Sequence, residues 1–337
     1  MILAENIVAF STDGDSLVAA TKEVVFDVAS GEVLLRFKAP ITTGSLLAHR
    51  GAVSAYDHNG ECRVHFRGRI WEMRTGMVRQ VVEGDIYFVV GKHVHLRSAL
   101  VDIYDAKLWT VGYRSTISYV VEKKVVILSD RADSHNQRLV GVDYRTGKEL
   151  YSIEFGSVTP DVIGVEEGVL WVVNERAGSI VSYDAYDGRR LAAISEQCIS
   201  EMQKVSVRIS VLKYDASNQK LVHPYGELDI TNESFRLRKQ FPYQQPGSKL
   251  PIFPQVLLFD FNDKHIVHGL WVHLPDGDAE GRLQVVSRDE ESKLLLDIYI
   301  SDTRTDAGLV DVALLDDSVI YLDNDGYLRE VKFANGE

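Results

Sequence analysis

The sequence of residues 139–155 is Leu-Val-Gly-Val-Asp-Tyr-Arg-Thr-Gly-Lys-Glu-Leu-Tyr-Ser-Ile-Glu-Phe, and the fold of the whole chain can be inferred from it. Two short runs of alternating apolar residues flank a turn at Arg145, Thr146 and Gly147, which is typical of a β-hairpin whose turn needs a residue that tolerates positive φ. Asp143 lies four residues before the glycine. We expect its carboxylate to accept hydrogen bonds from backbone N–H groups of the turn.

The same pattern of an acid four residues before a glycine occurs three more times. The further pairs are Asp27 with Gly31, Glu72 with Gly76, and Asp184 with Gly188. The glycines at 31, 76, 147 and 188 are 45, 71 and 41 residues apart, and the long interval contains a weaker unit from Gly84 to Trp109. We interpret all of these acids and glycines as structural residues of hairpin turns.

A period near 40 residues, with about four strand-length runs in each period, is typical of a β-propeller blade. We find no convincing amphipathic helix and therefore predict an all-β chain. Residues 1–337 are expected to form a single β-propeller domain of four-stranded antiparallel blades, seven in number, with eight as the alternative. The first strand, near Ile2 to Phe10, is expected to complete the last blade, built from Leu309 to Phe333, and so to remove open sheet edges.

A resemblance to a known superfamily supports this fold. The run Asp-x-x-Thr-Gly-Lys-x-Leu at Asp143 to Leu150, echoed at Asp27 to Leu34 and Asp184 to Leu191, resembles the repeat of the quinoprotein-like (PQQ-like) β-propellers, which grade into WD40-like repeats. Quinoprotein dehydrogenases carry a vicinal disulfide beside their cofactor, whereas this sequence has no adjacent cysteines. The resemblance therefore implies the fold, and we assign no cofactor and no catalytic residue from it.

Composition limits the classes of partner. The chain has 45% hydrophobic and 26% charged residues and a net charge of −12, which opposes binding to nucleic acid or to an anionic membrane surface. We see no secretory signal and no apolar run long enough for a membrane helix, so we expect a cytoplasmic protein. The two cysteines, Cys62 and Cys198, lack metal-type spacing and are expected to be reduced.

Other polar and aromatic residues were weighed as sites. His93 and His95 lie on one side of a predicted strand, but no third metal ligand is near them in the sequence. His265, His268 and His273 are spread over two predicted strands and the turn between them, and we weight them no higher. The runs 276–280 and 323–326 resemble calcium loops but suit hairpin turns better. The four tryptophans, Trp71, Trp109, Trp171 and Trp271, are expected to pack between blades rather than to stack on a sugar or cofactor. We therefore predict no metal site.

One segment departs from the repeat. Four of the eight prolines fall between 242 and 254, so residues 235–254 are predicted to form an irregular loop. A long aromatic loop on a propeller is a plausible docking device, whereas the alternative is a loop that merely covers a blade. The candidate partner-binding residues are Arg236, Arg238, Phe241, Tyr243 and Phe253.

Because no nucleophile, acid/base or metal arrangement is evident, we predict a non-enzymatic protein-binding propeller, whose acidic surface would favour a basic partner. A bacterial immunity protein that neutralises a basic toxin fits this description. The alternative is a cytoplasmic hydrolase or lactonase with a site at the central channel, its residues scattered over several blades. Recognition of a polysaccharide or peptide is a third class, which the sequence does not separate from the first. The sequence leaves the oligomeric state open.

Overall fold

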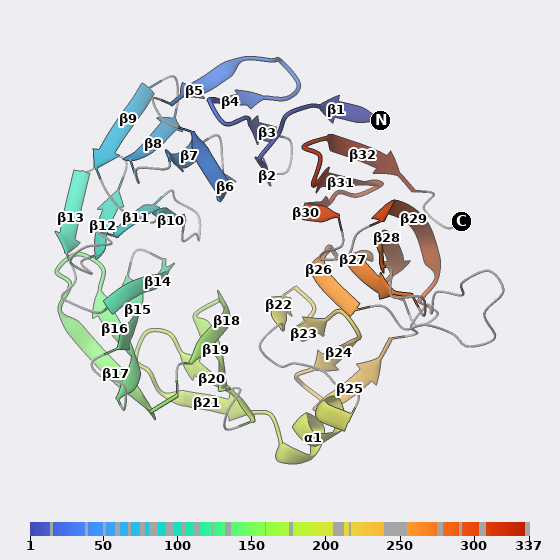
Figure 1. The fold of residues 1–337 in the computed structure, drawn as a ribbon. Helices are drawn as coiled ribbons and strands as arrows, with labels where there is room; N and C mark the ends of the chain where they lie inside the picture. The colour runs from blue at the N-terminus through green and yellow to red at the C-terminus, as the bar shows by residue number, and fades with distance from the viewer. Residues whose placement is uncertain are drawn as a thin grey trace. The chain divides into compact units, whose positions relative to one another are not determined.

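The structure is a computed structural model of the chain (Figure 1). It describes residues 1–13, 16–37, 40–49, 52–57, 61–66, 69–74, 78–80, 87–91, 98–102, 106–110, 115–122, 124–131, 136–158, 160–174, 178–204, 212–215, 217–238, 255–274, 279–289, 292–302 and 308–333. The chain forms two compact units. Unit 1 comprises Met1–Asn59, Arg63–Glu72 and Arg238–Glu337, and unit 2 comprises Gly60–Cys62 and Met73–Leu237.

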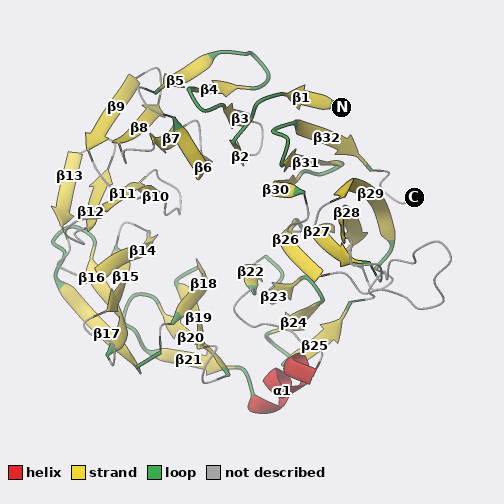
Figure 2. Ribbon diagram, viewed as in Figure 1, coloured by secondary structure: helices red, strands yellow, loops and turns green. Residues whose placement is uncertain are grey.

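The described strands form eight four-stranded antiparallel sheets, each built from strands that follow one another in the chain, apart from one exchange at the N-terminus. Strands are yellow in Figure 2, where they account for nearly all of the regular structure. The prediction of an all-β chain of four-stranded antiparallel sheets is confirmed. The described strands form eight such sheets, which matches the alternative blade count rather than the preferred count of seven.

Unit 1 holds three complete sheets and most of a fourth. They are β2 (Ala9–Asp13), β3 (Ser16–Ala20), β4 (Val24–Asp27) and β5 (Val33–Arg36); β6 (Ile41–His49), β7 (Ala52–Asp57), β8 (Glu61–Phe66) and β9 (Arg69–Arg74); β26 (Gln255–Phe261), β27 (His265–His273), β28 (Ala279–Ser287) and β29 (Leu294–Asp302); and β30 (Leu309–Leu314), β31 (Ser318–Asp323) and β32 (Leu328–Lys332) with β1 (Ile2–Ala4).

Unit 2 holds four sheets of consecutive strands. They are β10 (Val78–Gln80), β11 (Tyr87–Gly91), β12 (Ser98–Asp102) and β13 (Ala106–Thr110); β14 (Ser115–Val121), β15 (Val125–Arg131), β16 (Gln137–Asp143) and β17 (Glu149–Gly156); β18 (Asp161–Glu166), β19 (Val169–Asn174), β20 (Ser179–Asp184) and β21 (Arg190–Ala193); and β22 (Lys213–Asp215), β23 (Lys220–His223), β24 (Gly226–Asp229) and β25 (Ser234–Leu237).

The N-terminal strand completes the last sheet of unit 1. β1 pairs with β32, with Ile2 opposite Arg329 and Ala4 opposite Leu328. The backbone N–H of Glu330 donates to the carbonyl of Met1 at 2.9 Å, and the N-terminal ammonium of Met1 donates back to the carbonyl of Glu330 at 2.7 Å. The prediction that the first strand is lent to the last blade is thereby confirmed. Both ends of unit 1 are tied into one sheet.

Apolar faces hold neighbouring sheets together within each unit. In unit 1, Phe10 of β2 packs with Ile320 and Leu322 of β31. In unit 2, Ile127 of β15 packs with Leu170 and Val172 of β19. The middle strand β19 is apolar on both sides, because Leu170 and Val172 pack with β15 whereas Trp171 and Val173 join the core that contains α1 and β22–β25. The terminal strand β17 alternates between exposed and half-buried residues. A single four-stranded sheet could not bury these faces alone.

One short helix interrupts the described strands, at a place where the sequence showed no convincing amphipathic helix. α1 (Glu196–Lys204), red in Figure 2, lies between β21 and β22 of unit 2. Its buried residues are Cys198, Ile199 and Met202. Ile199 follows Cys198 by one residue and Met202 follows it by four, so all three lie along one side of the helix. These residues join the core of β18–β21 and β22–β25, and this packing stabilises a helix of only nine residues.

Candidate functional site

Three of the predicted turns join the third and fourth strands of a sheet. Asp27 Oδ1 accepts hydrogen bonds from the backbone N–H of Ser30 at 2.7 Å and from its hydroxyl at 2.6 Å. Asp143 Oδ1 likewise accepts from the backbone N–H and the hydroxyl of Thr146, both at 2.7 Å. Asp184 Oδ1 accepts from the backbone N–H groups two and three residues on. Each carboxylate thus receives donors that the tight turn leaves without a strand partner.

The glycines of these three turns adopt positive φ. Gly31, Gly147 and Gly188 have φ of 73, 67 and 72°, and their N–H groups donate to the backbone carbonyls of Asp27, Asp143 and Asp184. A residue with a Cβ would be strained there. Gly188 also lies against the ring of Tyr151 of the preceding sheet, with which a Cβ at this position would clash.

The hydrogen bonds of these turns stabilise the charged form of their acids. The side chain and then the backbone N–H of Ser30 hold the pKa of Asp27 below its usual value. Thr146 lowers the pKa of Asp143 in the same way. The donors in the turns therefore bind the ionised carboxylates.

A fourth turn of this type has no glycine, and sequence reasoning missed it. Asp229 Oδ1 accepts from the backbone N–H of Thr231 at 2.9 Å and of Asn232 at 3.0 Å, between β24 and β25. Glu233 occupies the position that glycine has in the other three turns, with φ of 48°. The spacing from Asp229 to Glu233 is the same four residues, but a search that requires glycine does not find it.

The predicted hairpin at Glu72 and Gly76 is not a hairpin between paired strands. β9, which contains Glu72, is the fourth strand of one sheet, and β10 is the first strand of the next. The segment therefore connects two sheets, because a local pattern of acid and glycine does not determine which strands pair. Gly76 and the side chain of Glu72 lie outside the described part of the chain.

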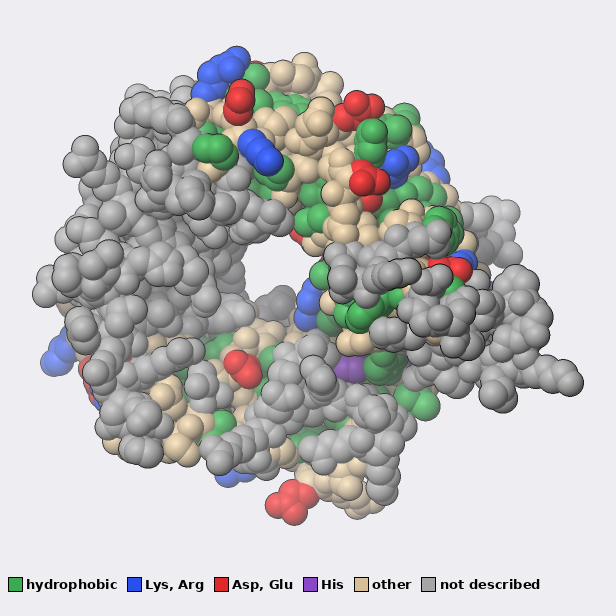
Figure 3. Space-filling model, viewed as in Figure 1, with side chains coloured by type: hydrophobic (Ala, Val, Ile, Leu, Met, Phe, Trp, Pro, Cys, Tyr) green, Lys and Arg blue, Asp and Glu red, His purple; other side chains and the backbone are tan. Residues whose placement is uncertain are grey.

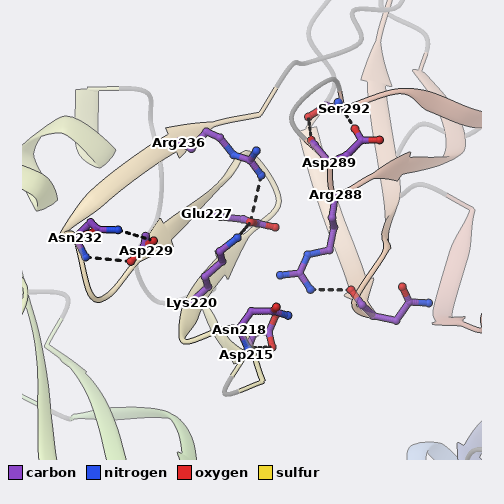
Figure 4. A network of polar contacts seen from close by, with 11 residues as sticks. Asp215, Asn218, Lys220, Glu227, Asp229, Asn232, Arg236, Arg288, Asp289 and Ser292 are labelled. Atoms are coloured by element: carbon purple, nitrogen blue, oxygen red, sulfur yellow. Dashed lines mark hydrogen bonds and ion pairs between the residues drawn. The ribbon is translucent and has the colours of Figure 1, made fainter.

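A buried carboxylate with two cations lies on one face of the β22–β25 sheet (Figure 4). Glu227 of β24 is only 3% exposed. Its Oε2 atom is 3.1 Å from Nζ of Lys220 in β23 and 3.4 Å from the guanidinium of Arg236 in β25. Because a buried carboxylate is costly without such partners, the two cations are what allow Glu227 to lie there.

Strand register explains why these charges share one face. Glu227 lies opposite Arg236 on β25, and Lys220 lies opposite Asp229 on β24. The residues between them, Leu221 and Leu228, point to the other face and join the core with β18–β21 and α1. The charged face could have been suspected from the alternation of charged and apolar residues in 220–229, but its pairing depends on the register.

The predicted partner-binding residues fall into three groups. Arg236 lies on β25 with 42% of its side chain exposed and its guanidinium beside Glu227. Arg238, two residues on, is buried with 5% exposed. The aromatic residues of the set, Phe241, Tyr243 and Phe253, lie outside the described residues.

The other candidate residues gain no common site. Within the described ranges, no group of three or more His, Cys, Asp or Glu side chains could hold a metal ion. His265 and His268 are buried in β27, 5% and 8% exposed, whereas His93 and His95 are not described. Trp171 is buried beside Tyr214, their ring centroids 6.0 Å apart, between β18–β21 and β22–β25. In the turn that begins at Asp323, the Oδ1 atom of Asp323 accepts a hydrogen bond from the backbone N–H of Tyr327 at 2.9 Å.

Charge on the visible part of unit 1 is mixed. On the face shown in Figure 3, acidic and basic side chains of this unit are interspersed among apolar ones rather than gathered in one patch. Among the described residues, no helix has the length and hydropathy that crossing a membrane requires.

Comparison with known proteins shows the fold. The structure is similar to BamB from Moraxella catarrhalis, with a TM-score of 0.57 and 13% identity over 99% of this chain and 98% of that one. It is also similar to Saccharomyces cerevisiae Sqt1, with a TM-score of 0.60 and 10% identity over 98% and 97% of the two chains. No family model and no curated protein matches the sequence. The chain has a β-propeller fold, and at these identities the likeness extends to the fold alone.

Proposed function

We propose that the chain is a non-enzymatic, cytoplasmic binding module that holds another protein, and that β25 contributes to the contact. The observation that supports this most directly is a pair of neighbouring residues. Arg236 is 42% exposed, and Leu237 beside it is 50% exposed. Arginine is enriched at protein interfaces, and side chains alternate along a strand, so β25 presents Arg236 on one face and the exposed apolar side chain of Leu237 on the other.

Glu227 gives this arginine a fixed position. Because Glu227 is buried and lies 3.4 Å from the guanidinium, Arg236 loses less side-chain freedom on binding than an unrestrained arginine would. β25 is also the last strand of its sheet, so Leu237 lies at an edge.

The finer proposal concerns the kind of partner. The net charge of −12 supports a basic protein, because opposite charge accelerates encounter and disfavours wrong partners. A bacterial toxin bound by this chain as its immunity protein is one such pair. This version predicts that the partner is toxic when expressed alone and harmless when expressed with this chain.

The test is affinity capture from a lysate of the source organism at physiological salt, followed by mass spectrometry. We expect one stoichiometric partner, which is lost with Arg236→Ala combined with Leu237→Ala and weakens as salt rises. The chain offers a matched control, because Arg190 and Leu191 form the same dipeptide on the terminal strand β21. Arg190 and Leu191 are both exposed, and Arg190→Ala with Leu191→Ala should retain the partner.

Two outcomes would contradict the proposal. Equal loss with both double variants would show that β25 has no special part in binding. Capture of no partner by the folded wild-type chain would contradict the binding module itself. Assays on lactone and ester substrates, with elemental analysis for bound metal, would then address the hydrolase alternative.

A further inference from the structure

The terminal strand β29 of unit 1 differs from most other terminal strands of the protein. It runs over nine residues, Leu294–Asp302, with the sequence Leu-Leu-Leu-Asp-Ile-Tyr-Ile-Ser-Asp. It is the last strand of its sheet, so one of its edges has no neighbouring strand among those described. Leu294 is 38% exposed and Tyr299 is 49% exposed. A long apolar strand at a sheet edge is a template for pairing with another chain.

Other terminal strands are protected in ways that β29 is not. β5, β21 and β25 have four residues each, and each contains an arginine; β1 has three residues. β17 has eight residues, but it contains Glu149 and Glu154 and ends at Gly156. Short length and charge are the usual means of blocking edge pairing. The interior of β29 has a single charged residue, Asp297.

That charge is already compensated within the sheet. Asp297 Oδ1 is 2.9 Å from the guanidinium of Arg282 in β28, and its Oδ2 accepts from Nε2 of Gln284 at 3.2 Å. The carboxylate is held against β28, and this weakens its ability to prevent another strand from pairing with the edge of β29. β29 is thus an apolar edge strand.

The two sides of β29 specify what kind of strand would pair with it. Leu296 and Ile298 lie on the side that packs with β30–β32, whereas Asp297 and Tyr299 lie on the opposite side. A strand added to this edge would place alternate residues beside each set, because side chains alternate along a strand. Apolar residues fit beside Leu296 and Ile298. Lysine or arginine fits over the exposed part of the Tyr299 ring.

We propose that the outward edge of β29 binds an extended segment of the partner in which apolar residues alternate with lysine or arginine, and that this segment adds a strand to the sheet. This inference rests on the proposed function, since it names a surface for the bound protein. Backbone hydrogen bonds would supply affinity and the alternating side chains would supply selectivity. The net charge of −12 favours such a segment over a second copy of this chain, because two copies repel each other.

The test uses the full chain and a synthetic nine-residue peptide in which valine and lysine alternate, matched to the nine residues of β29. A peptide of the same composition, with the lysines gathered at one end, is the control for alternation. We expect the alternating peptide to bind by fluorescence anisotropy and to slow amide hydrogen exchange in residues 294–302. Leu294→Lys with Tyr299→Lys should weaken binding by about tenfold through charge repulsion at the edge.

The chain supplies a matched control for these variants. Leu150 of β17 is 49% exposed and Leu191 of β21 is 42% exposed. These exposed fractions are similar to those of Tyr299 and Leu294. Leu150→Lys with Leu191→Lys should leave peptide binding and the exchange of β29 unchanged. All four positions are exposed, so the melting temperature of each variant should match that of the wild type.

Several results would overturn the proposal. They are equal binding of the two peptides, equal loss with both variant pairs, no slowing of exchange in β29, or dimerisation of the chain that Tyr299→Lys abolishes, which would make a second copy the occupant. A captured protein that depends on Arg236 and Leu237 but is retained by the β29 variant would refute the role of β29 and leave the proposed function standing. Capture of no protein, with the peptide results as expected, would refute the proposed function and leave the binding of an extended segment at β29 standing.

Discussion

The carboxylate of Glu233 accepts a hydrogen bond from the backbone N–H of Ser195, 3.2 Å away and 38 residues earlier in the chain. Ser195 precedes α1, and its hydroxyl accepts from the backbone N–H of Cys198 at 3.4 Å, as an N-cap residue does. The turn between β24 and β25 thereby meets the start of the only helix among the described residues. Glu233 makes this contact from a positive φ of 48°, a conformation that glycine adopts more easily.

Substitution of Glu233 should separate the hydrogen bond from the backbone conformation. Glu233→Ala removes the bond to Ser195 but keeps a Cβ at positive φ, so we expect it to be the least stable form. Glu233→Gly also removes the bond but relieves the strain, and it should be about 1 kcal/mol more stable than Glu233→Ala. Chemical denaturation of both variants measures this difference. Equal stability would contradict a strained backbone at this position.

The core beneath α1 should be sensitive to loss of volume. Met202 is fully buried and packs in one cluster with Trp171 and Leu221. We expect Met202→Ala to lower the free energy of unfolding by about 2–5 kcal/mol, because it leaves a cavity between the helix and two sheets. Ser200→Ala, at an exposed position of the same helix, is the control and should have little effect. A small loss with Met202→Ala would mean that α1 is not docked on this core.

The four-stranded sheets were predictable from the repeat, because the repeated sequence pattern depends on local features of turns and strands. The Asp143 to Gly147 segment contains both the donors and the conformations of its turn, and the alternation of β17 follows from its place at a sheet edge. The pairing of the first strand with the last is a long-range feature. It was predictable because β30–β32 supply only three strands, and a four-stranded blade needs one more.

Features that depend on register or on tertiary packing could not be predicted in the same way. Glu72 and Gly76 have the turn pattern in the sequence, but β9 and β10, the strands before and after residues 75–77, belong to different sheets. The ion pairs of Glu227 depend on which residues of β23 and β25 lie opposite it. α1 did leave a signal in Ser195 followed by a buried stripe, yet nine residues are too few for periodicity to decide.

His265 has an environment that disfavours its charged form. The ring is 5% exposed and lies edge-on against Phe333, with centroids 5.0 Å apart. Its Nδ1 atom has no hydrogen-bond partner among the described residues. Burial, followed by the charge of Lys264, lowers the pKa of His265 from its ordinary value of 6.5, while Asp316 and Asp289 oppose the shift.

A lowered pKa in the folded state has a definite consequence for stability. Below pH 6.5 the unfolded chain binds a proton at His265 more readily than the folded chain does, so the free energy of unfolding should decrease as the pH falls from 6.5 toward the folded pKa. Above pH 6.5 this contribution is constant. His265→Leu removes the titrating group, and we expect its denaturation midpoint to fall less than that of the wild type between pH 7 and pH 5. Parallel pH profiles for the two proteins would show that the shift in the pKa of His265 does not contribute to acid sensitivity.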